Sequence, residues 1–535
     1  MLICEGLVEY MRQWDAGKFA AAGITSLNAR VPLAVHQALT RLLQTQSSDG
    51  SWGPRSSLEE TSYAVLTIKC LLSLPFNSGL RDVALGAIQK GESYLQDRYS
   101  CGYVSIRERL WIDKTFYSIE TVSRSYIISA LLAQVPKIEA GDALSRLFNA
   151  PQSIIQKQGK FLRSLPSFSQ IPEWVVESSI REGYMLVDEL RKLDFFSQRA
   201  KLSDEYLISC SSCFVASNNR DSYFLSTDYL MMVLRITVAT YQLDTFMDHQ
   251  VVAFSATEID DLECFVHKSF QTEESLPNEP NEINILIQCQ DNSHSRVEDA
   301  KIQLRSFIQF MLSCPSGTVS RYDRMNLRNE LKTALLAQIA HIKSSRHLLQ
   351  GRGVTLHEKA RETTFFSWLR GPASDNVLYP VILKYMICHM GDVERHRGND
   401  IFQTTEAKYI LEDFCKHAAA EVRLWNDYGS NERDKAEGVL NSIDIIELSS
   451  PSSSVNGCVG GTAERHRKIE ALRNMAQYEN RHVRLSLEQL ERVLEAGCAP
   501  RGSLLMSRLR MHELVTQVWA EMYSLRQFSA TSVQS

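Results

Sequence analysis

Apolar residues that recur every three or four positions dominate this chain. In residues 329–349 that spacing is followed by Leu331, Ala334, Leu335, Ile339 and Ile342. Side chains at this spacing share one face of a helix, which can then pack on a core. The stretches AVHQALTRLLQTQ (34–46), YAVLTIKCLLSL (63–74) and VSRSYIISALLAQV (122–135) repeat the pattern. Alternating strand patterns between turn residues are scarce, so we predict an all-α fold.

Length and charge exclude several classes of protein. A chain of 535 residues is long enough for about two to four domains. Its net charge of −5 offers no basic excess for nucleic acid. No run of eighteen apolar residues predicts a membrane span, and the first residues lack the pattern of a signal peptide. We therefore expect a cytoplasmic protein, in which the CxxC pair Cys210 and Cys213 stays reduced in the core.

Polar segments interrupt the helical pattern and divide the chain. Residues 272–298 are polar and carry prolines, and residues 446–462 are rich in Ser and Gly. Both segments are predicted to be loops. A change of composition near residues 136–144 predicts a domain boundary, with one helical unit over 1–135 and a second over 136–535.

A tryptophan turn lies in the first unit. Gln46, Gly50 and Trp52 form the pattern Q-x3-G-x-W. Gly50 can adopt a positive φ at little cost. Trp52 can then fold back on the end of the preceding helix, where Gln46 can bond to backbone groups. This arrangement is structural and carries no chemistry.

Two carboxylates stand four positions apart in YQLDTFMDHQ (241–250). Asp244 and Asp248 share a helix face at this spacing, where like charges repel. The preceding stretch, residues 230–243, is strongly apolar, so the helix is expected to be mostly buried. Carboxylates in such a place need a partner or a metal ion, although a solvated surface face is the alternative for a lone pair.

A second set of oxygen donors lies in EVRLWNDYGSNERDKAEGVLNSIDI (421–445). Asn426, Ser430 and Asp434 are spaced i, i+4 and i+8 and form one stripe of a helix. An amide oxygen, a hydroxyl and a carboxylate suit Mg²⁺, which binds through few protein ligands together with substrate phosphates. The alternative is a helix start with a solvated polar face. Gly429 within the stripe is unusual for a stable helix.

Together these motifs resemble those of fungal class I diterpene synthases. N-D-x-x-S-x-x-x-D is similar to their second metal motif, with Asp434 in the usual Glu position, and DTFMD resembles their aspartate-rich motif, with Thr245 at a position that is normally acidic. SRYDRMNLRNELKTALLAQIAHI (320–342) and TTFFSWLRGPASDN (363–376) resemble the same proteins. The likeness is to the kaurene-synthase half of fungal bifunctional copalyl diphosphate/kaurene synthases.

The first unit resembles the β domain of the same group. The tryptophan turn is followed by Glu-Thr-x-Tyr-Ala (60–64) and Leu-Trp-Ile-x-Lys (110–114). The Asp-x-Asp-Asp motif that starts class II cyclisation is missing, and the closest string, EIDDLE (258–263), begins with Glu. The resemblance implies a partial, α/α-barrel-like β domain over 1–135, without class II chemistry, and a class I helical bundle as catalytic α domain over 136–535.

The resemblance implies a Mg²⁺-dependent cyclase that ionises geranylgeranyl diphosphate and cyclises the carbocation to a diterpene. Three Mg²⁺ ions are expected. Asp244 and Asp248 would hold two ions, and Asn426, Ser430 and Asp434 the third. Arginine recognises diphosphate through its planar fork, and the candidates are Arg370, Arg423, Arg433 and Arg220. Aromatic faces stabilise cations, and the pocket candidates are Tyr241, Phe214, Phe246, Phe365 and Trp425.

Other functions stay open at this point. The substrate could instead be a copalyl-type diphosphate made by another enzyme, or farnesyl diphosphate. A non-catalytic helical binding protein is a more remote alternative, since Thr245 departs from the motif. A prenyltransferase that makes longer chains is disfavoured, because such enzymes usually carry two D-D-x-x-D motifs.

Overall fold

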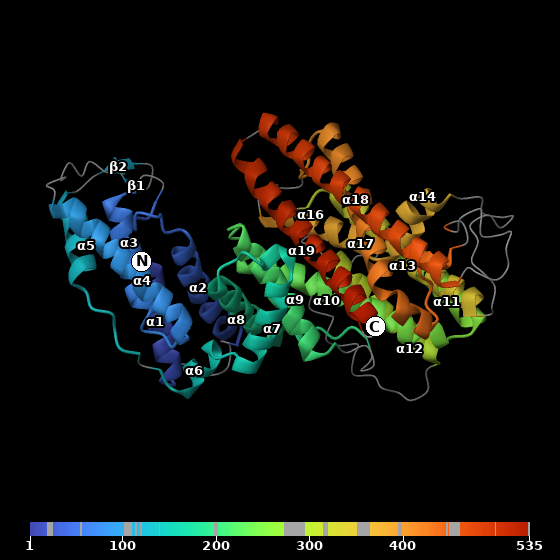
Figure 1. Ribbon diagram of the computed structural model, residues 1–535, viewed down its shortest axis with the longest axis horizontal. Helices are drawn as coiled ribbons and strands as arrows, with labels where there is room; N and C mark the ends of the chain where they lie inside the picture. Colours follow the sequence, from blue (N-terminus) through green and yellow to red (C-terminus); the bar gives the residue numbers. More distant parts are fainter. Residues whose placement is uncertain are drawn as a thin grey trace. The chain divides into compact units, whose positions relative to one another are not determined.

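The computed structural model describes most of the chain. Outside the description lie residues 19–24, 54–55, 101–109, 113–114, 118–119, 139, 197–201, 272–294, 314–318, 350–363, 394–398, 446–447, 449–460, 498 and 533–535. The described residues are overwhelmingly helical, which confirms the all-α prediction. Their one sheet is an antiparallel pair of three-residue strands, β1 (Leu110–Ile112) and β2 (Thr115–Tyr117) (Figure 1). None of the described helices has the length and apolarity needed to cross a membrane.

The chain divides into two compact units. Unit 1 comprises Met1–Glu189 and Asp204–Met231, and unit 2 comprises Leu190–Ser203 and Met232–Ser535. The helices of unit 1 are α1 (Leu2–Asp15), α2 (Thr25–Gln44), α3 (Leu58–Leu71), α4 (Ser78–Ser100), α5 (Glu120–Leu132), α6 (Asp142–Phe148), α7 (Gln152–Ser164), the 3₁₀ turn η1 (Pro166–Phe168), α8 (Glu173–Leu190, ending at the unit boundary) and α9 (Asp204–Arg220). Buried Val35, Leu39, Val65 and Ile68 are part of its core.

The tryptophan turn forms as the sequence predicts. The indole Nε1 of Trp52 donates to the Leu42 carbonyl at the end of α2 (2.8 Å). The Gln46 side chain donates to the carbonyls of Gly50 (3.0 Å) and Ala87 (2.9 Å). Gly50 has φ +91°, and a Cβ there would lie 2.5 Å from the Lys90 carbonyl oxygen. Glycine is therefore required at position 50 both by the backbone conformation and by the neighbouring helix α4.

The structure divides the chain at a different place from the predicted boundary near residue 135. Buried polar contacts join α2 to α8, and α8 to α9: His36 Nε2 lies 2.9 Å from Ser178 Oγ, and Gln37 Nε2 donates to Glu182 Oε1 (2.6 Å). Asn219 donates to Ser179 Oγ (3.0 Å). Helices α6 to α9 thus pack with unit 1. A polar stretch in the sequence marks a surface connection, whereas the division of a chain depends on which buried faces meet.

Unit 2 is built around long helices. Its elements are α10 (Thr227–His249, whose first residues belong to unit 1), η3 (Val251–Ala253), α11 (Ala256–Ser269), α12 (Arg296–Leu312), α13 (Arg321–Leu349), α14 (Phe365–Trp368), the π-helical turn η6 (Leu369–Ala373), α15 (Ser374–Asn376), α16 (Tyr379–Val393), α17 (Thr405–Glu437), η7 (Ser442–Asp444), α18 (Gly461–Gly497) and α19 (Ala499–Ser532). Helix α17 packs along both α18 and α19, and α16 packs on α13 and on α17 (Figure 1). These contacts place α17 at the centre of unit 2.

Two segments that the sequence predicts to be loops lie largely outside the described residues. In the predicted loops 272–298 and 446–462, the described part is mainly the start of the next helix, α12 at Arg296 and α18 at Gly461.

The two cysteines of the CxxC pair lie in α9. Cys210 and Cys213 are free, buried thiols. Burial raises the pKa of Cys213 to about 12 and that of Cys210 further. Both thiols therefore stay protonated, as expected for core cysteines.

Candidate active site

Helix α10 turns its apolar residues into the core and leaves two carboxylates on another face. Leu243, Phe246 and Met247 are buried in the core of unit 2, whereas Asp244 is half-buried and Asp248 is exposed. Thr245, which stands where the motif is normally acidic, donates its hydroxyl to the Tyr241 carbonyl one turn earlier (2.9 Å). The Thr245 side chain is therefore engaged by its own helix, and the carboxylates of this motif are those of Asp244 and Asp248.

Both carboxylates are harder to ionise than ordinary ones. Desolvation and the nearby Asp248 raise the pKa of Asp244 to about 8, although Gln338 donates to Asp244 Oδ1 (2.5 Å) and Arg423 adds positive charge. Desolvation by surrounding protein atoms raises the pKa of Asp248 to about 6, even though its side chain still reaches solvent. A cation bound at this face would relieve the repulsion and favour both charged forms.

The second motif forms one stripe on the last turns of α17. Asn426 is half-buried, and Ser430 and Asp434 are buried. Ser430 Oγ lies 2.5 Å from Asp434 Oδ2 and 2.7 Å from the Asn426 carbonyl. A hydroxyl carries one hydrogen and donates to one of these oxygens at a time. In the predicted i, i+4, i+8 stripe, Ser430 is thus bonded to the Asp434 side chain and to the backbone carbonyl of Asn426.

Charged groups of the two motifs lie close enough within unit 2 to influence one another. The charges of Arg433, Asp434 and Glu437 on α17 all act on Asp248 of α10, and the charge of Arg423 acts on Asp244. Motifs far apart in sequence therefore come within electrostatic range. No group of three or more His, Cys, Asp or Glu in the described residues is arranged to hold a metal ion by itself. Mg²⁺ suits this arrangement, because it commonly takes one or two carboxylates and completes its shell with water and phosphate oxygens.

Gly429 is explained by packing against α19. A Cβ at position 429 would lie 2.7 Å from Tyr523 Cβ and 2.8 Å from the Tyr523 carbonyl oxygen. Helix α19 therefore approaches α17 closely at a position within the oxygen stripe. The glycine that looked out of place in a stable helix is the residue that allows this approach.

The four candidate arginines have different surroundings. Arg433 is half-exposed and lies beside the stripe, with its Nη2 3.0 Å from Asp434 Oδ1. Arg423 is buried and donates to Asp427 Oδ2 (2.9 Å) and to the Leu440 carbonyl (3.1 Å). Its guanidinium is therefore bonded within the interior of unit 2. Arg370, on the π-helical turn, donates to both oxygens of Glu479 (2.8 and 2.9 Å). Arg220 belongs to unit 1 and pairs with Asp221 (3.3 Å).

Glu479 holds Arg370 as part of a buried cluster. Nδ1 of His417 lies 2.5 Å from Glu479 Oε2, and Arg370 stacks over Phe366 at 4.5 Å. Burial opposes ionisation of Glu479, but the hydrogen bonds from His417 and Arg370 lower its pKa on balance. These contacts tie η6 to α17 and α18. The guanidinium of Arg370 is therefore committed to an internal ion pair.

The five aromatic candidates do not form one group. Phe214 is buried in α9 of unit 1, and Phe246 stacks on Phe196 in the core of unit 2 (centroids 4.6 Å apart). Phe365 and Trp425 are half-buried and pack against the cluster around Leu424 and Leu472. Tyr241 is 41% exposed, one turn before Asp244. An aromatic side chain on an apolar helix more often fills the core than lines a pocket, which sequence alone could not distinguish.

Sequence reasoning missed two polar residues beside the motifs. Gln338 of α13 is buried and bonds to Asp244. Asn441, just after α17, is buried and donates from Nδ2 to Asp434 Oδ2 (2.9 Å). The sequence offered one signal for Gln338, a polar side chain among the apolar residues of 329–349. The sequence does not identify its partner, because tertiary packing decides which residue it bonds to.

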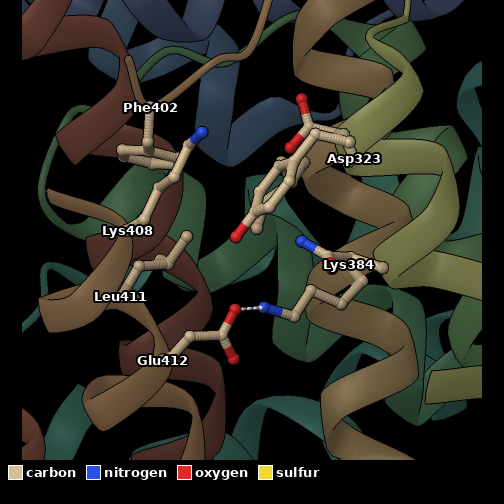
Figure 2. Close-up of a pocket in the computed structure, with 9 residues that line it drawn as sticks. Asp323, Lys384, Phe402, Lys408, Leu411 and Glu412 are labelled. Atoms are coloured by element: carbon tan, nitrogen blue, oxygen red, sulfur yellow. Dashed lines mark hydrogen bonds and ion pairs between the residues drawn. The ribbon is translucent and has the colours of Figure 1, made fainter. Parts of the chain in front are cut away.

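A small polar pocket lies at the other end of α17 (Figure 2). Its lining comes from α13, α16, α17 and the segment before α17. Its charged groups are paired: Lys384 with Glu412, Lys408 with Asp400 and Asp323 with Ser320. Glu412 and Asn426 are fourteen residues apart, which corresponds to about 21 Å of helix. This pocket is separate from the two motifs, and one of its ion pairs joins α16 to α17.

The acidic string EIDDLE has structural partners in α11. Glu258 forms a capping box with Ser255 at the helix start. Asp260 and Glu263 pair with Lys343 (2.7 Å each), and Asp261 pairs with Lys301 (2.7 Å). These acids cap a helix or form surface ion pairs, as expected for a string that does not match the class II motif.

Comparison with known proteins supports the resemblance read from the motifs. No protein-family model matches the chain. The chain is 28% identical over 557 residues to the pimaradiene synthase of Emericella nidulans, covering 98% of this chain and 54% of that protein. It is 25% identical over 553 residues to the ent-kaur-16-ene synthase of Fusarium fujikuroi, covering 99% of this chain and 55% of that protein.

The chain spans about half the length of these relatives. Among solved structures, the match to abietadiene synthase from Abies grandis covers 90% of this chain and 55% of that protein, at 13% identity. Its TM-score of 0.36 is too low to establish a shared fold. The sequence matches carry the conclusion: over nearly its whole length, this chain is a relative of fungal diterpene synthases.

Proposed function

We propose that this chain is a class I diterpene cyclase that depends on Mg²⁺. One observation carries the proposal: Asp248 of α10 lies within electrostatic range of Asp434 and Arg433 of α17, although the two motifs are far apart in sequence. Two separate sets of hard oxygen donors on two helices suit a diphosphate held between cations. The relatedness to fungal diterpene synthases supports the same chemistry.

The residues of the site divide into two groups. Asp244 and Asp248 would hold Mg²⁺ on the α10 side, and Asn426, Ser430 and Asp434 would hold it on the α17 side, with three ions in all. When bound, the ions would act as Lewis acids on the leaving diphosphate. The pKa values of Asp244 and Asp248, raised by desolvation and like charge, fit this role because a bound cation would favour the ionised forms.

Arg433 is the best placed of the arginines to bind diphosphate. Its guanidinium lies at the edge of the stripe and is 54% exposed. A planar fork can engage phosphate oxygens by two parallel bonds. Arg423 and Arg370 have internal partners, so we assign them to holding the site in shape. For the pocket, Tyr241, Phe365 and Trp425 remain proposals, and Phe246 is better explained by core packing.

The proposed substrate is geranylgeranyl diphosphate, which the chain would cyclise to a polycyclic diterpene with release of diphosphate. A copalyl-type diphosphate from another enzyme and farnesyl diphosphate are the alternatives. We further propose that the catalytic α domain lies in unit 2, which carries both motifs, and that a β-type domain lies in unit 1, which carries the tryptophan turn.

The test is direct. Purified protein is incubated with Mg²⁺ and, separately, with farnesyl, geranylgeranyl and copalyl diphosphates, and the hydrocarbons are analysed by mass spectrometry. We expect product from geranylgeranyl diphosphate, and product from none of the three would refute the proposal. Asp244→Ala and Asn426→Ala should each abolish turnover while circular dichroism stays unchanged. Retained activity in both variants would contradict the metal assignments.

A further inference from the structure

The segment after α17 folds back onto the helix that carries the second motif. Gly438 ends α17 in the left-handed conformation (φ +69°), and the amide of Val439 bonds to the Asp434 carbonyl (2.9 Å). Such a glycine cap reverses the chain direction at low cost. The amide of Leu440 then bonds to Ser345 Oγ on α13 (3.0 Å), and the Leu440 carbonyl accepts from Arg423. The return of the chain is therefore fixed on two helices.

Asn441 is the residue of this segment that reaches the stripe. Its Nδ2 donates to the Asp427 carbonyl (2.9 Å) and to Asp434 Oδ2 (2.9 Å). Its Oδ1 accepts from the amide of Ile443 (3.2 Å), and its own amide donates to Asp444 Oδ2 (3.0 Å). The Asn441 side chain is buried, and both ends of its amide group have partners. Its orientation is set by this network, because only Nδ2 can donate to the two acceptors.

The contacts leave the two oxygens of Asp434 in different situations. Oδ2 is held from the interior by Ser430 and Asn441. Oδ1 is turned toward the half-exposed guanidinium of Arg433, at 3.0 and 3.2 Å. A side chain that exchanges with solvent can leave Oδ1, whereas Asn441 cannot leave Oδ2 without breaking a buried network. Oδ1 is thus the oxygen that an incoming cation can reach.

We infer that Asn441 is a positioning residue for the second metal motif, acting by fixing the carboxylate of Asp434 for Mg²⁺. The inference rests on the proposed function. Hydrogen-bond partners behind a metal ligand orient it, and their loss typically lowers metal affinity by about 10- to 100-fold. Asn441 has this place in the structure, although it lies outside the i, i+4, i+8 stripe.

Ser442 provides a matched control within the same segment. It is as buried as Asn441, and its hydroxyl and amide also bond to α17. Its partner, however, is Asp427 Oδ2, which pairs with Arg423 and is not part of the stripe. A change at Ser442 therefore reports the structural role of the segment alone.

The decisive variant is Asn441→Ser. Serine can still accept the Ile443 amide as a helix cap, but it is too short to replace the bond to Asp434. We expect the Mg²⁺ concentration for half-maximal turnover to rise about 10- to 100-fold in Asn441→Ser, and to stay at the wild-type value in Ser442→Ala. Mn²⁺ binding in the presence of inorganic diphosphate, followed by electron paramagnetic resonance, should weaken in the same variant only.

Each result of these measurements either supports or overturns the positioning role of Asn441. Unchanged metal dependence in Asn441→Ser, or an equal shift in Ser442→Ala, would overturn the positioning role while leaving the cyclase proposal intact. If the wild-type protein makes no product from any prenyl diphosphate, the proposed function fails, but the Mn²⁺ measurement still tests Asn441. A wild-type protein that binds no Mn²⁺ with diphosphate would overturn the inference as well. Melting temperatures of all variants identify any that fail to fold.

Discussion

Gln338 of α13 donates a 2.5 Å hydrogen bond to Asp244 of α10, and its second amide hydrogen goes to the Asn376 carbonyl (2.7 Å). One buried side chain thereby connects the aspartate-rich motif with the segment after the π-helical turn. The half-buried Asp244 has this amide as a direct partner, and Asp244 is a proposed metal ligand. We therefore expect Gln338 to orient the carboxylate of Asp244.

Replacing Gln338 by Leu should damage both the fold and the site. Loss of a buried donor leaves two acceptors unsatisfied and costs about 1–3 kcal/mol in the free energy of unfolding. Turnover should also fall, because Asp244 is no longer oriented. Gln242→Leu is the control: Gln242 is buried on α10 and donates to the Leu193 carbonyl (2.8 Å), so it should lose stability but keep activity. Equal activity in the two variants would contradict the role of Gln338.

Thr245→Ala should leave both activity and stability close to wild type. The hydroxyl of Thr245 bonds to the carbonyl of its own helix, and such bonds contribute little to helix stability. We expect a change in the free energy of unfolding within about 0.5 kcal/mol. Asp248→Ala, three positions later on the same helix, should by contrast abolish turnover. Steady-state kinetics compare the two, and a strong loss in Thr245→Ala would show that the threonine takes part in the site.

Gly429→Ala should separate α17 from α19. The added methyl group would lie 2.7 Å from Tyr523 Cβ, and such overpacking costs about 1–3 kcal/mol. Gly86→Ala is the matched control, because nothing lies within 4 Å of a Cβ at that position in α4. There alanine should stabilise the helix by about 0.5–1 kcal/mol. Thermal unfolding should thus move in opposite directions, and a stabilised Gly429→Ala would contradict the close approach.

Arg433→Gln should weaken substrate binding, whereas Arg370→Gln should lower the stability of the fold. Arg433 is half-exposed, so its loss should spare the melting temperature but raise the KM for prenyl diphosphate about tenfold or more, the value of one charge-assisted bond. Arg370 neutralises the buried Glu479, and breaking that pair should cost about 3 kcal/mol of stability. Kinetics and thermal unfolding of both variants provide the measurements. An unchanged KM in Arg433→Gln would exclude it as the diphosphate-binding residue.

His36 should make unit 1 less stable in mild acid. Burial, with the positive charge of Arg181 as a smaller cause, lowers the pKa of His36 to about 4, against the raising effect of the Ser178 carbonyl. An unfolded histidine has a pKa of about 6.5. As the pH falls from about 6.5 to about 4, the unfolded chain takes up a proton that the folded chain does not, so stability decreases. The loss from this residue amounts to at most about 3 kcal/mol.

The check on His36 is the drop in melting temperature between about pH 7.5 and about pH 5. His36→Gln cannot take up the proton, so its drop should be smaller than that of the wild-type protein, although its melting temperature at neutral pH is lower. His512, whose pKa burial lowers to about 4, keeps part of the dependence in the variant. Identical drops in the two proteins would contradict the assignment.

The sequence predicted the local features that depend on neighbours along the chain. Periodicity predicted α13 and the all-α fold, because a stripe of apolar residues needs no information from elsewhere in the chain. The tryptophan turn followed from Gln46, Gly50 and Trp52, since Gln46 bonds to Gly50 and Trp52 to the end of the preceding helix; only its packing against α4 depends on residues farther along the chain. The alignment of Asn426, Ser430 and Asp434 followed from helical geometry alone.

Other features were decided only by tertiary contacts. The boundary near residue 135 differs from the division of the structure, because buried polar side chains of α2 bond to α8, and α9 bonds to α8 in turn. Phe246 resembles a pocket residue in sequence but stacks on Phe196 in the core. Arg370 and Arg433 are equivalent in sequence, yet Glu479 holds one of them inside the protein.

The same distinction holds for the candidate site. The sequence by itself determined which oxygen donors lie on which helix, since i, i+4 spacing fixes a face. Only the tertiary structure decided that Asp248 lies within electrostatic range of Asp434, that Gln338 bonds to Asp244 and that Asn441 bonds to Asp434. The physical reason is that a hydrogen bond or a Coulomb interaction depends on distance in space, and distances between helices are set by how all their buried faces pack together.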